Sequence, residues 1–177
     1  MKFARTWAMP NSKTFDIKPI ALFVQSYLKD SKVSVDPFSG NKRLATYTND
    51  LNPNTIAEEH TDALSFLNAL ADKGVKADLI ILDPPYSARQ ISECYSSFGL
   101  KTSMQDTQIG HMFKQVRDAA NRIASDNAVV LSFGWNTVGM GINRGYAQIE
   151  IMLCAHGGAH NDTICLAERK IQKRREV

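Results

Sequence analysis

The feature that most constrains the fold is a short apolar run, Ala77–Leu82, that ends in the tetrapeptide Asp83-Pro84-Pro85-Tyr86. An apolar run of this length, followed directly by proline, is typical of a strand that is buried on both faces of a sheet. Such strands belong to parallel sheets covered by helices, because parallel neighbours need long crossover connections. The tetrapeptide therefore follows the carboxyl end of an inner strand, where open α/β sheets bind their ligands.

The rest of the chain alternates helical and strand patterns. Apolar spacing predicts helices over 17–28, 63–71 and 108–124, and strands over 32–35, 44–49 and 128–133. We interpret the apolar stripe of the third helix as core packing. Two late strands, 146–153 and 163–167, follow each other without a helix, which predicts an antiparallel pair at one edge. The pattern as a whole predicts the α/β class, with a twisted and mostly parallel sheet.

Length and composition set the outer limits. The 177 residues fit one domain, 1–177, with 168–177 as a basic C-terminal tail or a phosphate-contacting arm. Residues 1–10 lack a signal core and no apolar run approaches about 18 residues, so we expect a cytoplasmic protein without a membrane partner. Cys94, Cys154 and Cys165 are expected to be free thiols. The net charge of +3 permits a polyanionic partner without requiring one.

The tetrapeptide carries the groups that methyl transfer to the amino group of a base requires. The lone pair of that nitrogen is delocalised into the ring, so the amine needs acceptors on its N–H bonds before it can attack. The Asp83 carboxylate and the Pro84 carbonyl can accept these bonds, and the prolines fix φ and remove competing donors. Tyr86 offers a flat face to an extruded base. We expect Asp83, Pro84, Pro85 and Tyr86 to be catalytic; an ordinary Pro-Pro turn with a surface tyrosine is the alternative.

The chain resembles the S-adenosylmethionine-dependent DNA amino-methyltransferases, and within them the small phage-type adenine-specific N6 enzymes. Besides the tetrapeptide, the resemblance rests on 11–20, 36–40, Asp50 and Asp62-Ala63, in the family's order, and it covers most of the chain. It implies a Rossmann-like class I methyltransferase fold, S-adenosyl-L-methionine as cofactor, and methylation of adenine N6 in DNA. It also implies the cytoplasm of a bacterium or of a phage-infected host.

The resemblance assigns the cofactor contacts by segment. Segment 11–20 resembles the motif at the methionine end of the cofactor, and 36–40 resembles the glycine-bearing loop. Asp50 matches the acidic position that binds the ribose, a role that a carboxylate one strand from a glycine loop fits, and Asp62-Ala63 matches the pair that reads the cofactor's adenine. Taken alone, Asp50 and Asp62 are also typical turn or helix caps. The implied cofactor-binding residues are Lys13, Thr14, Phe15, Asp36, Pro37, Phe38, Gly40, Asp50, Asp62 and Ala63.

The sequence departs from the family pattern directly after Gly40. The family usually has a second glycine and then a full helix, whereas here only Asn41, Lys42 and Arg43 precede the next predicted strand. A parallel crossover normally takes about a dozen residues or more. We therefore expect a shortened first crossover and a truncated or differently built cofactor wall.

No long insert follows the tetrapeptide, so recognition of DNA falls to short loops or to a second subunit, such as the other copy in a homodimer. Candidate contacts to the nucleic acid are Trp135, Lys42, Arg43 and Arg89, against the alternatives of solvated charge and, for Trp135, a cap on the core. The cysteine and histidine spacing in 154–160 fits no zinc pattern. We expect no metal there, but a hairpin loop over the active-site rim.

Several activities share this chemistry. Cytosine N4 in DNA, adenine or guanine in RNA, and glutamine amides in proteins are other planar amines, although the first position, Asp83, favours adenine. A non-catalytic subunit of the same fold that binds nucleic acid is an alternative from another class.

Overall fold

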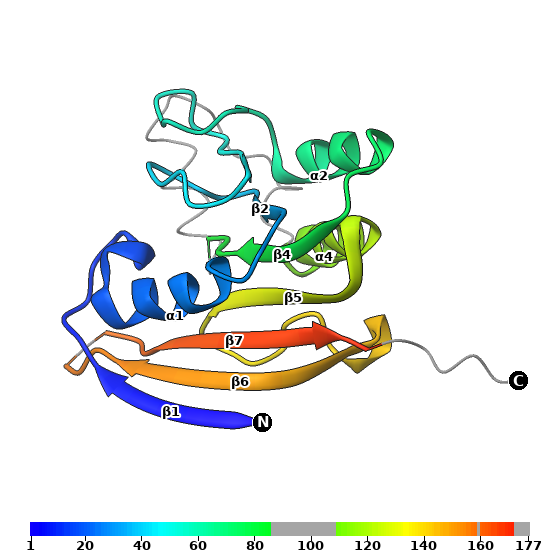
Figure 1. The fold of residues 1–177 in the computed structure, drawn as a ribbon. Helices are drawn as coiled ribbons and strands as arrows, with labels where there is room; N and C mark the ends of the chain where they lie inside the picture. The colour runs from blue at the N-terminus through cyan, green and yellow to red at the C-terminus, as the bar shows by residue number, and fades with distance from the viewer. Residues whose placement is uncertain (86–108, 159, 172–177) are drawn as a thin grey trace, which may run out of the picture.

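Strand β4, Ala77–Leu82, lies inside the sheet as its apolar sequence predicts (Figure 1). This computed structural model describes residues 1–85, 109–158 and 160–171, and in them seven strands form one sheet in the order β1-β6-β7-β5-β4-β2-β3. β7 is antiparallel to both of its neighbours, and every other neighbouring pair is parallel. The remaining strands are β1 (Lys2–Trp7), β2 (Ser34–Asp36), β3 (Tyr47–Thr48), β5 (Ala124–Gly134), β6 (Tyr146–Ala155) and β7 (Thr163–Lys170).

Helices cover both faces of the sheet, α1 on one side and α2 with α4 on the other (Figure 1). Alternate residues of β4 serve the two cores: Leu79 and Ile81 pack with α1, while Ile80 and Leu82 pack with α2 and α4. This two-sided burial explains why the run is apolar throughout. No helix in the described part of the chain is long and apolar enough to cross a bilayer. The helices are α1 (Lys18–Leu28), α2 (Ala63–Asp72) and α4 (Ile109–Ile123), with short 3-10 turns η1 (Thr14–Asp16) and η2 (Ile142–Arg144).

The structure confirms the predicted α/β class and the antiparallel pair formed by β6 and β7. It adds an outermost strand that the sequence did not predict, because β1 pairs in parallel with β6 and takes the edge position. The shortened first crossover is also confirmed: residues 37–46 join the parallel strands β2 and β3 without a helix.

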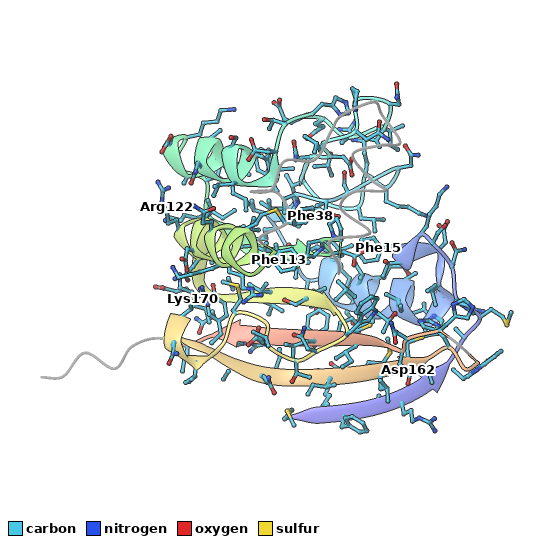
Figure 2. The ribbon with its side chains drawn as sticks, turned by 180° about the vertical axis from the view of Figure 1, so that it is seen from behind. Phe15, Phe38, Phe113, Arg122, Asp162 and Lys170 are labelled. Carbon is cyan, nitrogen blue, oxygen red and sulfur yellow. The ribbon has the colours of Figure 1, made fainter. Side chains whose placement is uncertain are left out.

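The boundary of the predicted basic tail, 168–177, is wrong, because β7 continues to Lys170. Glu168 is only 1% exposed, and its carboxylate accepts hydrogen bonds from the backbone N–H groups of Met140 and Gly141. Lys170, at the opposite end of β7 from Asp162 (Figure 2), donates to the backbone carbonyls of Asn121 and Ala124. Residues 172–177 lie outside the described residues.

Candidate functional site

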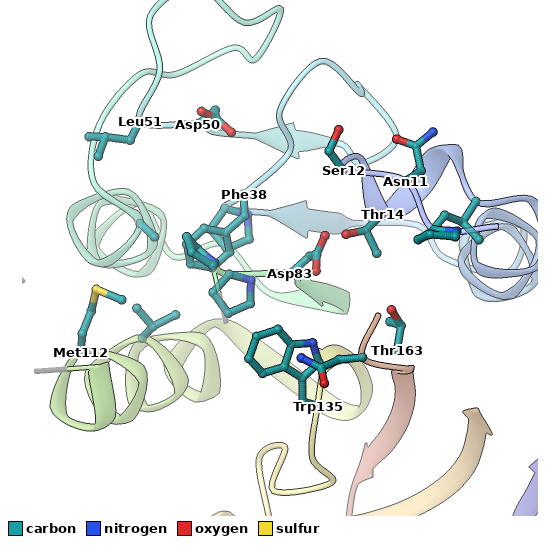
Figure 3. Close-up of a pocket in the computed structure, with 18 of the residues that line it drawn as sticks. Asn11, Ser12, Thr14, Phe38, Asp50, Leu51, Asp83, Met112, Trp135 and Thr163 are labelled. Atoms are coloured by element: carbon teal, nitrogen blue, oxygen red, sulfur yellow. The ribbon is translucent and has the colours of Figure 1, made fainter. Parts of the chain in front are cut away.

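A cavity of about 680 Å³ opens where the parallel strands β2, β3, β4 and β5 end (Figure 3). Its wall is drawn from the N-terminal segment with η1, the loops after β2 and β3, the start of α2, the ends of β4 and β5, helix α4, and the loop between β6 and β7. This is the edge at which the sequence predicts ligand binding. The lining residues are Pro10, Asn11, Ser12, Thr14, Ile17, Pro37, Phe38, Asp50, Leu51, Asp62, Ala63, Leu64, Asp83, Pro84, Pro85, Met112, Val116, Trp135, His156, His160, Asn161 and Thr163.

The predicted catalytic tetrapeptide contributes its first three residues, Asp83, Pro84 and Pro85, to this wall. Tyr86 lies outside the described residues. Trp135 follows β5, the neighbour of β4, and its side chain is 44% exposed and also lines the cavity. In Figure 3 the Asp83 side chain points into the space between Thr14 and Trp135. A carboxylate and a broad aromatic ring thus line the same cavity at the ends of two adjacent strands.

Asp50 holds the loops on either side of it while facing the cavity. One carboxylate oxygen accepts the backbone N–H of Gly40 at 2.8 Å, and the other accepts the backbone N–H of Asn52 at 2.8 Å. Gly40 has φ +53°, a conformation that favours glycine. Each carboxylate oxygen has further lone pairs, so Asp50 can accept additional hydrogen bonds from a ligand.

Asp62 and Ala63 line the same cavity at the start of α2. The Asp62 carboxylate caps the helix by accepting the Ser65 backbone N–H at 2.9 Å. The capping role that the sequence left as an alternative is therefore present, and it does not conflict with a ligand contact, because a carboxylate has several acceptor positions.

Asp36 lies beneath this wall, and its side chain is fully buried. One carboxylate oxygen accepts the Phe38 backbone N–H at 3.0 Å. Burial raises the pKa of Asp36 to about 8, the Phe38 hydrogen bond opposes the rise, and the negative charges of Asp83 and Asp50 add to it. Asp36 does not line the cavity, but Pro37 and Phe38, which follow it, do.

Two of the residues implied as cofactor contacts serve other roles in the structure. Phe15 belongs to the core beneath α1, where its ring meets that of Phe133 edge-on at a centroid distance of 5.2 Å. Lys13 is exposed outside the cavity lining, and its backbone N–H donates to the Asn11 side chain at 2.9 Å. Gly40 acts through its backbone bond to Asp50. The η1 turn explains why Thr14 lines the cavity and Phe15 does not, because it buries Phe15 while presenting Thr14 to the cavity.

The basic residues proposed for nucleic-acid contact are engaged within the protein. Lys42 forms an ion pair with Asp16, Nζ to Oδ1 at 2.6 Å, and this hydrogen bond lowers the pKa of Asp16. Arg43 pairs with Glu58. Both pairs tie the shortened crossover to neighbouring segments. Arg89 lies outside the described residues, so its role stays a prediction.

The expected rim loop between β6 and β7 lines the cavity. Within this loop His156 is only 6% exposed, a burial that the sequence did not predict. Its Nδ1 donates to the Ala8 carbonyl at 3.0 Å, because a carbonyl only accepts, and its Nε2 lies 2.9 Å from the Thr163 hydroxyl. The interpretation of the α4 stripe as core packing alone is also wrong, since Met112 and Val116 reach the cavity.

Among the described residues, no group of three or more histidine, cysteine, aspartate and glutamate side chains could hold a metal ion. The two described cysteines of the β6–β7 region, Cys154 and Cys165, are buried free thiols, as expected, and Cys94 lies outside the described residues.

No family model and no curated protein matches the chain. Solved structures match it in fold. TrmN from Thermus thermophilus matches with a TM-score of 0.59 over 88% of this chain and 49% of its own, at 13% identity. NSun6 from Pyrococcus horikoshii, solved with SFG, gives 0.55 over 84% and 50%, at 14% identity. The N-methyltransferase NodS from Bradyrhizobium japonicum WM9, in complex with S-adenosyl-L-homocysteine, gives 0.55 over 86% and 85%, at 12% identity.

These likenesses show the fold. The chain has the Rossmann-like class I fold of these methyltransferases, a mostly parallel sheet with one reversed strand, which confirms the predicted fold class. The chain spans about half the length of several of the structures that it matches.

Proposed function

We propose that this protein transfers a methyl group from S-adenosyl-L-methionine to the N6 amino group of adenine in DNA. The observation that carries the proposal is that Asp83, Pro84 and Pro85 share one cavity with Asp50 and the loop after β2. The first three residues of the tetrapeptide and the cofactor-like motifs thus line one cavity at one edge of the sheet, although Asn11 and Asp83 are about seventy residues apart in the sequence.

The residues present fit a nucleoside cofactor with an amino-acid arm. The volume of about 680 Å³ lies within the roughly 300–1,000 Å³ range of small-molecule sites. Asp50 would accept the ribose hydroxyls, and the apolar side chains Phe38, Leu51 and Leu64 would flank the adenine ring. The polar groups of the N-terminal segment, Asn11, Ser12 and Thr14, would hold the amino-acid end. When bound, the cofactor supplies an electrophilic methyl group on a sulfonium.

The chain's own residues would prepare the amine. The Asp83 carboxylate and the Pro84 carbonyl accept its two N–H bonds and draw the nitrogen lone pair out of conjugation with the ring, which is catalysis by positioning and preorganised electrostatics. Asp83 need not remove a proton beforehand, because the nitrogen becomes acidic once methylated; the carboxylate then receives that proton. Trp135 offers a stacking face at the cavity mouth.

The solved structures support the cofactor. NodS is named as an N-methyltransferase and is bound to S-adenosyl-L-homocysteine, the product that remains after methyl transfer from S-adenosylmethionine. We propose DNA as the partner and a second subunit as a source of target recognition, because the described loops around the cavity are short.

The test is transfer of labelled methyl groups to single- and double-stranded DNA, with mass analysis of the modified nucleosides. We expect N6-methyldeoxyadenosine among the nucleosides. Asp83→Ala should lower kcat by about 10³-fold, since an acceptor aimed at the reacting nitrogen is lost, while the Kd for S-adenosylmethionine stays close to that of the wild type. Asp126→Ala, an exposed carboxylate near the start of β5, is the matched control and should keep full activity.

The other outcomes separate the alternatives. Methylated cytosine, or label in RNA alone, would move the target class while keeping the chemistry. Cofactor binding without transfer to any substrate would indicate the non-catalytic subunit. Absence of S-adenosylmethionine binding at millimolar concentration in folded protein would overturn the proposal.

A further inference from the structure

Three carboxylates from neighbouring strands are arranged on one face of the sheet. Asp36 is paired in register with Thr48 of β3, and Val35 with Ile80 of β4. Asp50 and Asp83 therefore each stand two positions beyond the residues opposite Asp36, and side chains two positions apart along a strand share a face. Both carboxylates are near enough to Asp36 for their charges to act on it. Asp36 is the inner member of the group, and the other two line the cavity.

The inner member is buried without full hydrogen bonding. Asp36 is 0% exposed, and within the described part of the chain its Oδ2 has no hydrogen-bond partner. A buried polar oxygen left without a partner is costly and calls for a functional explanation. An asparagine would keep the one bond that the structure shows, to the Phe38 N–H. Loop structure alone therefore does not account for a carboxylate here.

The charges around Asp36 oppose its ionisation. Within the part of the chain that the structure describes, the charged groups that act on it are carboxylates, Asp83 from the end of β4 and Asp50 from the end of β3, and each raises its pKa. On η1, which supplies Thr14 to the same cavity, Asp16 is ion-paired with Lys42. A positive charge placed in the cavity would reverse this balance, because interactions in a low-dielectric interior are strong.

We propose that the cavity selects a positively charged ligand, and that Asp36 is the residue by which it distinguishes the sulfonium donor from the uncharged thioether product. This inference rests on the proposed cofactor. Asp36 acts through the field in the cavity without touching the ligand. When the cation enters, the Asp36 carboxyl group loses its proton to solvent and becomes the buried counter-charge; when the methyl group has left and the sulfur is neutral, it takes a proton back and the product is released more readily.

The experiment compares two ligands that differ by one methyl and one charge. The Kd values of S-adenosylmethionine and S-adenosylhomocysteine are measured by calorimetry for the wild type and for Asp36→Asn, which keeps shape and removes the charge. The ratio of the two Kd values measures the preference for the sulfonium, and we expect this preference to be about tenfold larger in the wild type than in the variant. A factor of this size is ordinary for the coupling between two sites. Asp126→Asn is the control: it removes an exposed carboxylate near the start of β5 that does not line the cavity, and should keep the preference.

A second readout uses the wild type alone. Calorimetry at pH 7 in buffers of different ionisation enthalpy counts protons, and because the pKa of Asp36 is near 8, binding of the sulfonium should release close to one proton. Release should disappear above pH 9, where Asp36 is already ionised, and in Asp36→Asn. His156 and His160 also line the cavity and are unchanged in the variant, so the difference isolates Asp36.

The outcomes distinguish this inference from the proposed function. If the wild type methylates DNA but Asp36→Asn has the same ligand preference and the same proton count, the role of Asp36 is overturned and the enzyme activity stands. If folded wild-type protein binds neither ligand, both proposals fall.

Discussion

The two halves of the sheet are built in different ways. On one side, β5, β6 and β7 have 11, 10 and 8 residues, and hydrogen-bonded ladders hold them along most of their length. On the other, β2 and β3 have only 3 and 2 residues. Both halves border the cavity. The short half nevertheless supplies more of the residues that we propose for the cofactor.

Side-chain hydrogen bonds replace the missing ladder in the short half. Buried Asn49 joins three segments: its Nδ2 donates to the carbonyls of Pro37 and Thr61, and its Oδ1 accepts the Thr61 N–H at 3.0 Å. Asp50 adds its bonds to Gly40 and Asn52. The comparison teaches that the proposed cofactor wall, in which no helix joins β2 to β3, can be held by a few polar residues, and that its stability and ligand affinity should therefore be linked.

Among the substitutions, the largest effect on stability is expected in the long half. Leu131, fully buried in β5, packs in the core beneath α1. Leu131→Ala should lower the free energy of unfolding by about 3 kcal/mol, through lost burial and a residual cavity. Urea unfolding measures the change. Since the folded variant keeps the polar ties of the short half, its Kd for S-adenosylmethionine should not change; a weakened Kd would show that the halves are not independent.

The next effect tests the short half. Asn49→Ala should cost about 2 kcal/mol, because it leaves buried backbone groups of Pro37 and Thr61 without partners. We also expect Asn49→Ala to bind S-adenosylmethionine more weakly, measured by calorimetry, because the Asn49 side chain no longer joins the loop after β2 to the segment before α2. The control is Asn121→Ala on α4, which removes a side-chain bond to the Tyr146 hydroxyl and does not touch the cavity wall. Equal ligand affinity in the two variants would contradict the proposed link.

The pH dependence of unfolding tests the short half through Asp36, the last residue of β2. The native state keeps Asp36 protonated up to pH about 8, whereas the unfolded chain ionises it near pH 4. Between these values the native state binds more protons, so stability should fall as pH rises, by up to about 1.4 kcal/mol per pH unit from this group. Below pH 4 both states are protonated and the decline is absent. Thermal unfolding of Asp36→Asn should lack this component; identical pH profiles would contradict the burial effect.

The smallest effect concerns the entry to α2. Asp62→Ala should cost about 1 kcal/mol, because the Ser65 N–H loses its capping acceptor, while Asp62→Asn should be nearly neutral. Chemical unfolding of the two variants gives the difference. A larger loss of ligand affinity than of stability in Asp62→Asn would indicate that the carboxylate contacts the ligand as well as the helix.

The sequence predicted the long, patterned elements better than the short or exposed ones. β4 has the bounds of the apolar run residue for residue, and α4 ends one residue before its predicted end, while its predicted first residue lies outside the described residues. The strand predicted over 44–49 shrinks to Tyr47–Thr48, because side-chain bonds take over from the ladder. β1 was missed since its side chains are largely exposed and leave no apolar alternation.

In the candidate site, too, the residues with a local sequence signal were identified, and those whose roles depend on distant partners were not. Asp83 and Trp135 were identified because each follows a predicted strand, and Asp50 and Asp62 because they match positions of the family that the chain resembles. The roles of Phe15, His156 and Met112 in the structure were not, because burial and cavity contact depend on partners far away in the chain.

The sequence by itself determined that an inner strand ends in an acidic Pro-Pro segment and that the chain alternates helix and strand, because hydrophobic period and proline act locally. Only the tertiary structure decided that Asp36 is sealed beneath two other carboxylates and that the buried His156 ring joins the β6–β7 loop to the Ala8 carbonyl. Those facts depend on strand order and register, which bring distant residues together and set the dielectric around each charge.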